Sequence, residues 1–237
     1  MTTTISFCSQ KGGVAKSTIA RTLAVEAARA GLSVKIADLD AEQGTVTNWV
    51  RKRISAEIEP MVRAESLKTV AQALALAPEY DVFIIDAPGR ASQGTLELAR
   101  VVDLLVQPTK PTLDDMEPAV RVFHGLVRNG IPKERLTFAL TRCGGDKRVE
   151  AAREYLQDAG YDVLEGCLYE KDAYADALDV GRAVTETRFK HLNEEADSII
   201  KAMIARITGA DDHGSQRSNR VSKAKAATKK VRRARGA

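Results

Sequence analysis

The chain of 237 residues has little of several features that mark particular protein classes. Its three cysteines, Cys8, Cys143 and Cys167, form no C-x-x-C pair, so the sequence predicts neither a disulfide framework nor a zinc site. Its three histidines have no thiol or carboxylate neighbours at ligand spacing, and we interpret them as surface or helix residues. This cysteine usage fits a reducing cytoplasm best.

Long apolar runs are also missing. No stretch reaches the roughly 18 apolar residues of a membrane span. The N-terminus, MTTTISFCSQ, lacks the basic segment and apolar run of an export signal. We therefore expect a protein that is not exported and has no stable membrane association. Hydrophobic residues make up 44% of the chain, which is enough to fill the core of one folded domain.

Charge is distributed unevenly along the chain. Residues 209–237 hold nine Lys or Arg and two Asp or Glu, a net charge of +7, whereas residues 1–208 carry −3. This basic tail has no aromatic residue and almost no large aliphatic one, so it cannot bury enough surface to offset the entropy cost of ordering. We predict a folded domain over residues 1–208 and a disordered basic tail over residues 209–237.

The basic tail is typical of segments that bind nucleic acid. Its cations would pair with phosphates and release counterions, which gives salt-sensitive binding to DNA of any sequence. The missing aromatics argue against stacking on bases. A charge run that only aids solubility is the alternative, and a membrane surface is disfavoured because the tail lacks an apolar helical face. The candidate DNA-binding residues are Lys223, Lys225, Lys229, Lys230, Arg232, Arg233 and Arg235.

Short apolar runs of strand length alternate with segments of helical periodicity. The apolar residues within 67–74 predict a helix that Ser66 would cap, and a stripe over 192–207 predicts a last helix that Gly209 ends. The alternation predicts an α/β fold: a three-layer, doubly wound, mostly parallel sheet with helices on both faces and ligands at the carboxyl ends of the strands. The expected strands are residues 5–8, 34–37, 82–85, 104–106 and 136–140.

A glycine-containing turn, SQKGGVAKST at residues 9–18, follows the first apolar run. A strand, a glycine turn, a lysine, a hydroxyl and a helix in this order form an anion site, because backbone N–H groups and a helix N-terminus face the phosphate. Gly12 and Gly13 would let the backbone approach the phosphates. Lys16 would reach the β- and γ-phosphates, and the Ser17 hydroxyl would ligate Mg²⁺.

The loop departs from the usual pattern G-x-x-x-x-G-K-[ST] at Gln10 and Ala15, and it carries an additional lysine, Lys11. With these features it resembles the deviant Walker A loop of the ParA/MinD superfamily of P-loop ATPases. In that superfamily the early lysine reaches across a dimer to the partner's nucleotide, so the resemblance implies catalytic roles for Lys11 and Lys16. The loop residues that it assigns to ATP binding are Gly12, Gly13, Val14, Ala15, Lys16, Ser17 and Thr18.

Ala15 stands where glycine is commonest in the superfamily. A Cβ is tolerable there with helical backbone angles but costs on the order of 1 kcal/mol or more if φ is positive. We favour a working loop. If the Cβ disables it, the chain would be a DNA-binding protein with an inactive nucleotide site.

Carboxylates end two of the expected strands. Asp38-Leu39-Asp40 resembles the superfamily's first switch segment, which implies that Asp40 orients the attacking water and that Asp38 lies near the water ligands of Mg²⁺. An aspartate pair that only caps a loop is the alternative. Asp86 ends the run VFIID and resembles the Walker B aspartate, which holds Mg²⁺. The implied metal-binding residues are therefore Ser17, Asp38 and Asp86.

Two segments resemble those that lie near the adenine in the superfamily. One contains Pro108, and the other is Thr141-Arg142, where many relatives carry an asparagine that reads the base. The resemblance implies nucleotide contacts for Pro108, Thr141 and Arg142. It implies ATP as the cofactor, but these residues do not themselves select a base.

The resemblance covers about residues 3–208. It implies a slow, Mg²⁺-dependent, partner-stimulated ATPase that forms a homodimer around ATP, binds DNA non-specifically and partitions plasmids, chromosomes or other cargo. A ParB-like activator or cargo adaptor and a cytoplasmic, nucleoid-associated location are implied with it. Residues 169–174 also resemble VirC-type proteins, so an accessory role in conjugative DNA transfer is an alternative. A redox role like that of the nitrogenase iron protein is disfavoured because Cys143 and Cys167 lack the spacing of cluster ligands.

Overall fold

The computed structural model describes residues 2–40, 43–89 and 92–208. The chain divides into two compact units, residues 1–202 and 203–237, and of the second only residues 203–208 are described. The expected basic tail, with all its candidate DNA-binding residues, lies outside the described residues. The division at residue 208 therefore stays a prediction.

Strands and helices alternate along the first unit. The strands are β1 (Thr3–Phe7), β2 (Val34–Asp38), β3 (Arg63–Ser66), β4 (Val82–Asp86), β5 (Leu104–Thr109), β6 (Leu136–Cys143), β7 (Asp162–Val163) and β8 (Leu168–Tyr169). The helices are α1 (Lys16–Arg29), α2 (Thr45–Ser55), α3 (Val70–Leu76), α4 (Ser92–Val101), α5 (Leu113–Arg128), α6 (Asp146–Asp158), α7 (Asp172–Asp179) and α8 (Lys190–Thr208). Three short 3₁₀ turns complete the described elements: η1 (Ala77–Glu79), η2 (Lys133–Arg135) and η3 (Val184–Glu186).

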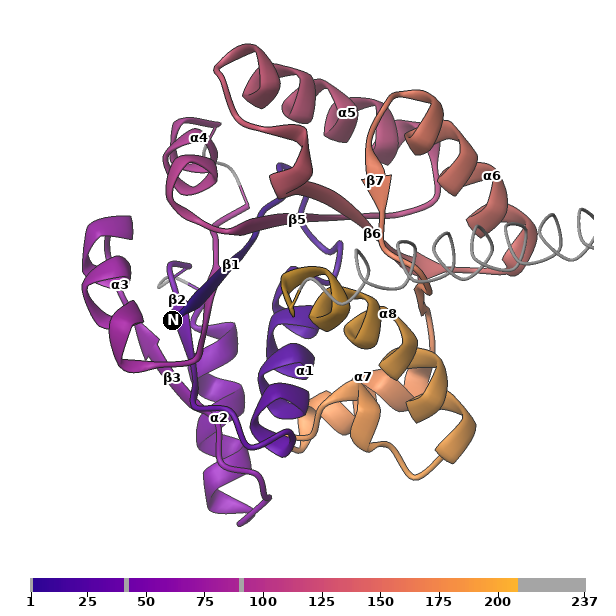
Figure 1. Cartoon of the computed structure of the whole chain (residues 1–237). Coiled ribbons are helices and arrows are strands. Elements are labelled where there is room, and N and C mark those ends of the chain that lie inside the picture. The colour runs from indigo at the N-terminus through magenta and orange to yellow at the C-terminus, as the bar shows by residue number, and fades with distance from the viewer. Residues whose placement is uncertain (1, 41–42, 90–91, 209–237) are drawn as a thin grey trace, which may run out of the picture. The chain divides into compact units, whose positions relative to one another are not determined.

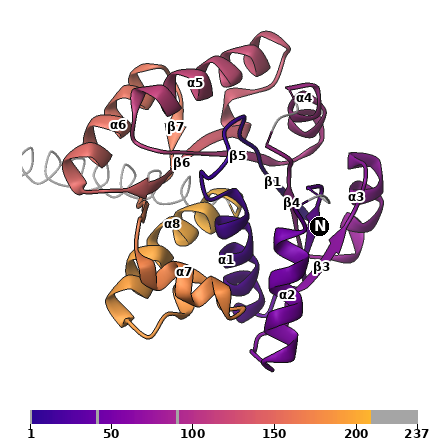
Figure 2. The same ribbon diagram turned by 180° about the vertical axis from the view of Figure 1, so that it is seen from behind.

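The strands form one sheet in the order β3-β2-β4-β1-β5-β6-β7, and β8 pairs with β6 off this path. All of these pairings are parallel. Helices α3 to α6 lie on one side of the sheet, while α1, α2 and α7 lie on the other side (Figures 1 and 2). The predicted α/β class and the doubly wound parallel sheet are confirmed.

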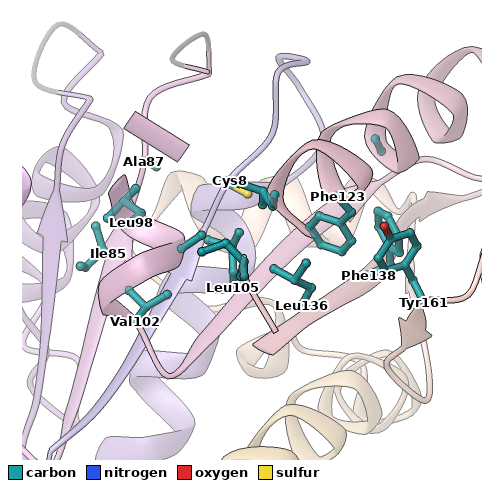
Figure 3. Close-up of a cluster of buried hydrophobic side chains, with 14 of the residues drawn as sticks. Cys8, Ile85, Ala87, Leu98, Val102, Leu105, Phe123, Leu136, Phe138 and Tyr161 are labelled. Atoms are coloured by element: carbon teal, nitrogen blue, oxygen red, sulfur yellow. The ribbon is translucent and has the colours of Figure 1, made fainter. Parts of the chain in front are cut away.

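The apolar core follows from the alternation of side chains along the strands. In β4, Phe83 and Ile85 face the helices α3 to α6, whereas Ile84 and Asp86 face the side of α1. Figure 3 shows Ile85, Leu105 and Phe138 of three strands packed against Leu98 and Phe123 of two helices. β4 and β5 are buried along their whole length, and each begins with a continuous apolar run, VFII and LLV.

One predicted boundary is wrong. Ser66 ends the edge strand β3 and does not cap a helix, since α3 begins at Val70 and the Thr69 hydroxyl accepts the Gln72 N–H at 3.2 Å. The sequence RAES of β3 carried no apolar signal because three of its four residues are exposed on the rim of the sheet. The last predicted helix is confirmed as α8, which ends at Thr208.

A buried ion pair fixes the C-terminal half of α2. Arg53 is fully buried, and its Nη1 lies 2.6 Å from Oε2 of Glu186 in η3. The same guanidinium donates to the carbonyls of Pro60 and Gly181. Since both ions are paired and hydrogen-bonded, this contact locates α2 against η3.

Candidate functional site

The loop between β1 and α1 lies at the carboxyl end of a central strand. Ala15 is the N-cap of α1 and has left-handed backbone angles, φ 62° and ψ 27°, with no side-chain cap. The N–H groups of the first turn of α1 therefore have no capping side chain and are available to an anion. Gly13 also has a positive φ of 69°, which explains glycine at that position.

The loop after β4 approaches this turn closely. A Cβ built on Gly89 would lie 3.7 Å from the Lys16 Nζ and 4.0 Å from the Ser9 carbonyl oxygen. The segment that follows Asp86 therefore lies beside Lys16, the lysine that is predicted to bind phosphate.

Two carboxylates stand side by side next to the loop. Asp38 and Asp86 are direct partners in the β2–β4 ladder, and they are 1% and 2% exposed. The Ser17 hydroxyl hydrogen-bonds to Asp86. Among the described residues, Asp38 Oδ2 and Asp86 Oδ1 are buried polar atoms without a hydrogen-bond partner. Buried carboxylate oxygens without a hydrogen-bond partner, at the ends of adjacent strands, are suited to bind a hard cation or its water ligands.

Burial controls the ionisation of this pair. Burial raises the pKa of Asp86 to about 6, while the Ser17 hydrogen bond opposes the rise and the Asp38 charge adds to it. Burial likewise raises the pKa of Asp38, against hydrogen bonds from backbone N–H groups that include the one of Asp40. Without a cation, the two carboxylates are held in an environment that disfavours their charge.

Asp40 lies at the turn between β2 and α2. Its N–H donates to Asp38 Oδ1 at 3.1 Å, and its carbonyl accepts from the N–H groups of Gln43 and Gly44. Its side chain is partly exposed. Ala41 and Glu42, the next two residues of this switch segment, lie outside the described residues.

Lys11 is held within its own chain. Its Nζ donates to the Asp114 carbonyl at 2.5 Å and lies 3.3 Å from Asp115 Oδ1. The Thr112 hydroxyl donates to the other oxygen of Asp115 at 2.7 Å, which fixes that carboxylate in the first turn of α5. The Lys11 side chain is nevertheless 43% exposed, so the contact can exchange with solvent.

The profile of the CobQ/CobB/MinD/ParA nucleotide binding domain, CbiA, matches residues 5–184, which is more than half of the chain. The chain belongs to this family. The resemblance to the ParA/MinD superfamily that the loop predicts is thereby confirmed. Among curated protein sequences, none matches the chain.

Solved structures in this family have the same fold. MinD of Pyrococcus horikoshii, complexed with Mg-ADP, matches with a TM-score of 0.64 and 20% identity over 85% of this chain and 94% of that one. McdA(D38A) of Cyanothece in complex with ATP gives 0.65 and 16% over 85% and 96%. A plasmid partition protein from Borrelia burgdorferi gives 0.62 and 17% over 86% and 99%.

In this ParA/MinD-type fold, the predicted nucleotide contacts of β5 and β6 fall at the same sheet edge. β5 continues to Thr109, so Pro108 is a buried strand residue paired with Ala139. The buried Thr141 hydroxyl lies 3.0 Å from the Val14 carbonyl, and it therefore supports the phosphate loop from within the fold. Arg142 Nη1 lies 3.8 Å from where a Gly13 Cβ would stand.

Arg21 is a member of this site that sequence reasoning missed. It lies one turn after Ser17, and its Nε donates to the Ser17 carbonyl at 2.9 Å. It is 7% exposed; burial lowers its pKa to about 10, against the attraction of the Asp86 and Asp38 charges. The i, i+4 spacing from Ser17 was the available signal, but an arginine on a helix is usually solvated.

The described residues contain no group of three or more His, Cys, Asp or Glu that could hold a metal by themselves. Within the same residues, no helix is long and apolar enough to span a membrane.

Proposed function

We propose that the chain is a ParA-type switch ATPase that dimerises around ATP, binds DNA non-specifically in that state and distributes plasmids or other cargo. One observation carries the proposal: a phosphate-type loop with an uncapped helix N-terminus adjoins two buried carboxylates with orphaned oxygens. The nucleotide complexes of the similar MinD and McdA structures support it.

Each residue of the proposed site has a distinct task. The N–H groups at the start of α1 and the Lys16 ammonium bind the phosphates, and Ser17, Asp86 and Asp38 would hold Mg²⁺. When bound, Mg²⁺ offsets the negative charge of the phosphates. Asp40 orients the attacking water beside Asp38. Phosphoryl transfer depends chiefly on such positioning and electrostatics.

Lys11 couples nucleotide binding to dimerisation. In the proposed dimer it reaches the partner's nucleotide, and its contact with Asp115 in its own chain must break first. The basic tail, whose residues lie outside the described part of the chain, would supply the phosphate contacts to DNA. An adaptor protein of the ParB kind would accelerate hydrolysis and release the dimer.

The decisive experiment measures DNA binding at fixed salt with ATP, with ADP and without nucleotide. We expect ATP to strengthen binding and Lys16→Ala to abolish the difference. Lys147→Ala, which removes an equal charge from the exposed first turn of α6, should keep the ATP response. Equal DNA binding in all three conditions by the wild type would contradict the proposal.

One observation favours a second candidate, a DNA-binding protein with an inactive nucleotide site. Ala15 has the positive φ that strains a residue with a Cβ. Equilibrium binding of labelled ATP separates the candidates, since the second requires that no binding be detected at millimolar ATP.

A further inference from the structure

Two cysteines that the proposed mechanism does not use face each other at the end of β6. Cys143 is the last residue of β6, and Cys167 directly precedes β8. In the β6–β8 pairing, Thr141 is opposite Leu168 and Cys143 is opposite Tyr169, and the register shifts between these two pairs. The thiols of Cys143 and Cys167 are within hydrogen-bond contact, and the residues are 1% and 5% exposed.

The surroundings of Cys167 stabilise a thiolate. The Cys143 thiol donates to it, which lowers the pKa of Cys167 against the effect of burial; the Arg153 charge acts in the same direction, and the Asp146 charge opposes it. The Tyr169 hydroxyl donates to Asp146. The same hydrogen bond, together with burial, raises the pKa of Cys143. By contrast, burial raises the pKa of Cys8 to about 12. Cys167 is therefore the more acidic thiol of the pair, whereas burial disfavours the thiolate of Cys8.

Arg153 is fixed in the position where it acts on Cys167. Its Nη1 donates to the carbonyls of Val163 and Leu164 at 3.1 and 2.9 Å, and its Nη2 donates to the Gly166 carbonyl at 3.0 Å. The turn that carries Cys167 is thus bound to α6 through a cation. A cation placed beside a thiol is the arrangement that favours reaction with peroxides.

We propose that Cys143 and Cys167 are a modification site that a peroxide converts reversibly into a disulfide. The Cys167 thiolate attacks one oxygen of hydrogen peroxide, the O–O bond breaks, and a sulfenic acid forms with release of one water after protonation. The Cys143 sulfur then attacks the sulfenic sulfur, which forms the S–S bond and releases a second water. The two thiols lose two electrons and the peroxide gains them. A dithiol reductant reverses the reaction by becoming a disulfide itself.

This site lies next to the phosphate loop, so a consequence follows that rests on the proposed function. Between Thr141, which contacts the Val14 carbonyl, and Cys143 stands Arg142, whose φ is positive and whose guanidinium reaches toward Gly13. A disulfide between Cys143 and Cys167 draws the end of β6 toward β8 and away from the loop between β1 and α1. Oxidation therefore weakens nucleotide binding.

The first test counts thiols in the unfolded, peroxide-treated full chain and maps the bond by mass spectrometry. Wild type should lose two of its three thiols, with a bond between the peptides that carry Cys143 and Cys167. Cys8→Ala should behave in the same way, and Cys143→Ser should give a sulfenic acid at residue 167 that a dimedone probe traps. Three remaining thiols in wild type, or a bond to Cys8, would overturn the proposal. This count needs no nucleotide, so it is independent of the proposed function.

The second test measures the affinity for a fluorescent ATP analogue before and after oxidation. We expect the dissociation constant of wild type to rise about fivefold or more and to return on reduction with dithiothreitol. Cys143→Ser should show no reversible change. An unchanged affinity in a chain with the mapped disulfide would refute the coupling alone. Absence of binding by the reduced wild type would instead refute the proposed function.

Discussion

Ala15 is the residue at which this chain departs most from the usual phosphate loop. A left-handed conformation costs a residue with a Cβ about 1–2 kcal/mol, and glycine adopts it freely. Because glycine also gains entropy in the unfolded chain, we expect Ala15→Gly to raise the free energy of unfolding by only about 0.5–1 kcal/mol. Urea unfolding without nucleotide measures the change.

A helical alanine provides the control for this substitution. Ala28 lies in the last turns of α1, where glycine should lower the free energy of unfolding by about 1 kcal/mol. If Ala15→Gly destabilised the chain as much as Ala28→Gly, the left-handed conformation of residue 15 would be wrong.

Removal of the Asp86 charge should stabilise the folded chain. The pKa of Asp86 rises from 3.8 to about 6 on folding, so its ionisation opposes folding above pH 4, and the full cost applies above pH 6. In a chelator, Asp86→Asn should raise the free energy of unfolding by about 3 kcal/mol at pH 7 and by roughly half of that at pH 5. Unfolding by urea at the two pH values tests both the size and the sign.

The same substitution should remove the stabilisation that Mg²⁺ and ATP together give to wild type. The exposed Asp158→Asn is the control and should change stability by less than about 0.5 kcal/mol at either pH. An equal gain for Asp86→Asn at pH 5 and pH 7 would show that packing, and not charge burial, is the cause.

At the scale of single elements, the sequence predicted best the strands that are buried on both faces of the sheet. The central strands β1, β2, β4, β5 and β6 stand where apolar runs occur, because parallel strands between two helical layers need apolar side chains on both faces. The edge strand β3 and the two-residue strands β7 and β8 escaped prediction. Backbone pairing to a neighbour forms them, and pairing leaves no pattern in side chains.

The ion pair between Lys11 and Asp115, in the first turn of α5, should weaken dimerisation. Asp115→Asn breaks the ion pair with Lys11, and pairs of this exposure contribute about 0.2–1 kcal/mol. If Lys11 of each protomer must leave Asp115 to reach the partner's nucleotide, two such pairs break per dimer, and the dissociation constant of the ATP-bound dimer should fall by about two- to thirtyfold. Sedimentation velocity across a concentration series measures it.

Asp114 supplies the matched control, since its backbone carbonyl and not its carboxylate contacts Lys11. Asp114→Asn removes the same charge from the same turn and should leave dimerisation unchanged. Equal effects of the two substitutions would assign the change to general charge, without a role for Lys11.

At the scale of the whole chain, DNA binding by the basic tail should be separable from ATP turnover by residues 1–208. Deletion of residues 210–237 should reduce DNA affinity at physiological salt while ATP turnover stays the same. Wild type should lose affinity with a slope of log K against log salt near −6, as expected for about seven phosphate contacts, and the truncated chain should have a much smaller slope. Fluorescence anisotropy with labelled DNA gives both slopes.

How far the sequence located the site depends on which contacts are local. The sequence placed the loop, Asp38 and Asp86 together because the loop follows β1 and the two aspartates end β2 and β4, and parallel strands end at one edge. Arg21 was not found, although it bonds Ser17 of the same helix, because its proximity to Asp38 and Asp86 depends on how α1 packs on the sheet. The Lys11–Asp115 pair was not found because the sequence leaves the position of α5 open. Chain order alone also does not say that β2 neighbours β4.

The pairing of β2 with β4 constrains how the sequence can change over evolutionary time. Asp86 is level with Phe7 on one side and with Asp38 on the other. Since successive side chains point to opposite faces, one inserted or deleted residue in β4 would turn the carboxylate into the apolar layer under α3 to α6. Descendants of this sequence should therefore exchange the apolar residues of β2 and β4 readily, yet keep the length of each strand up to its aspartate invariant.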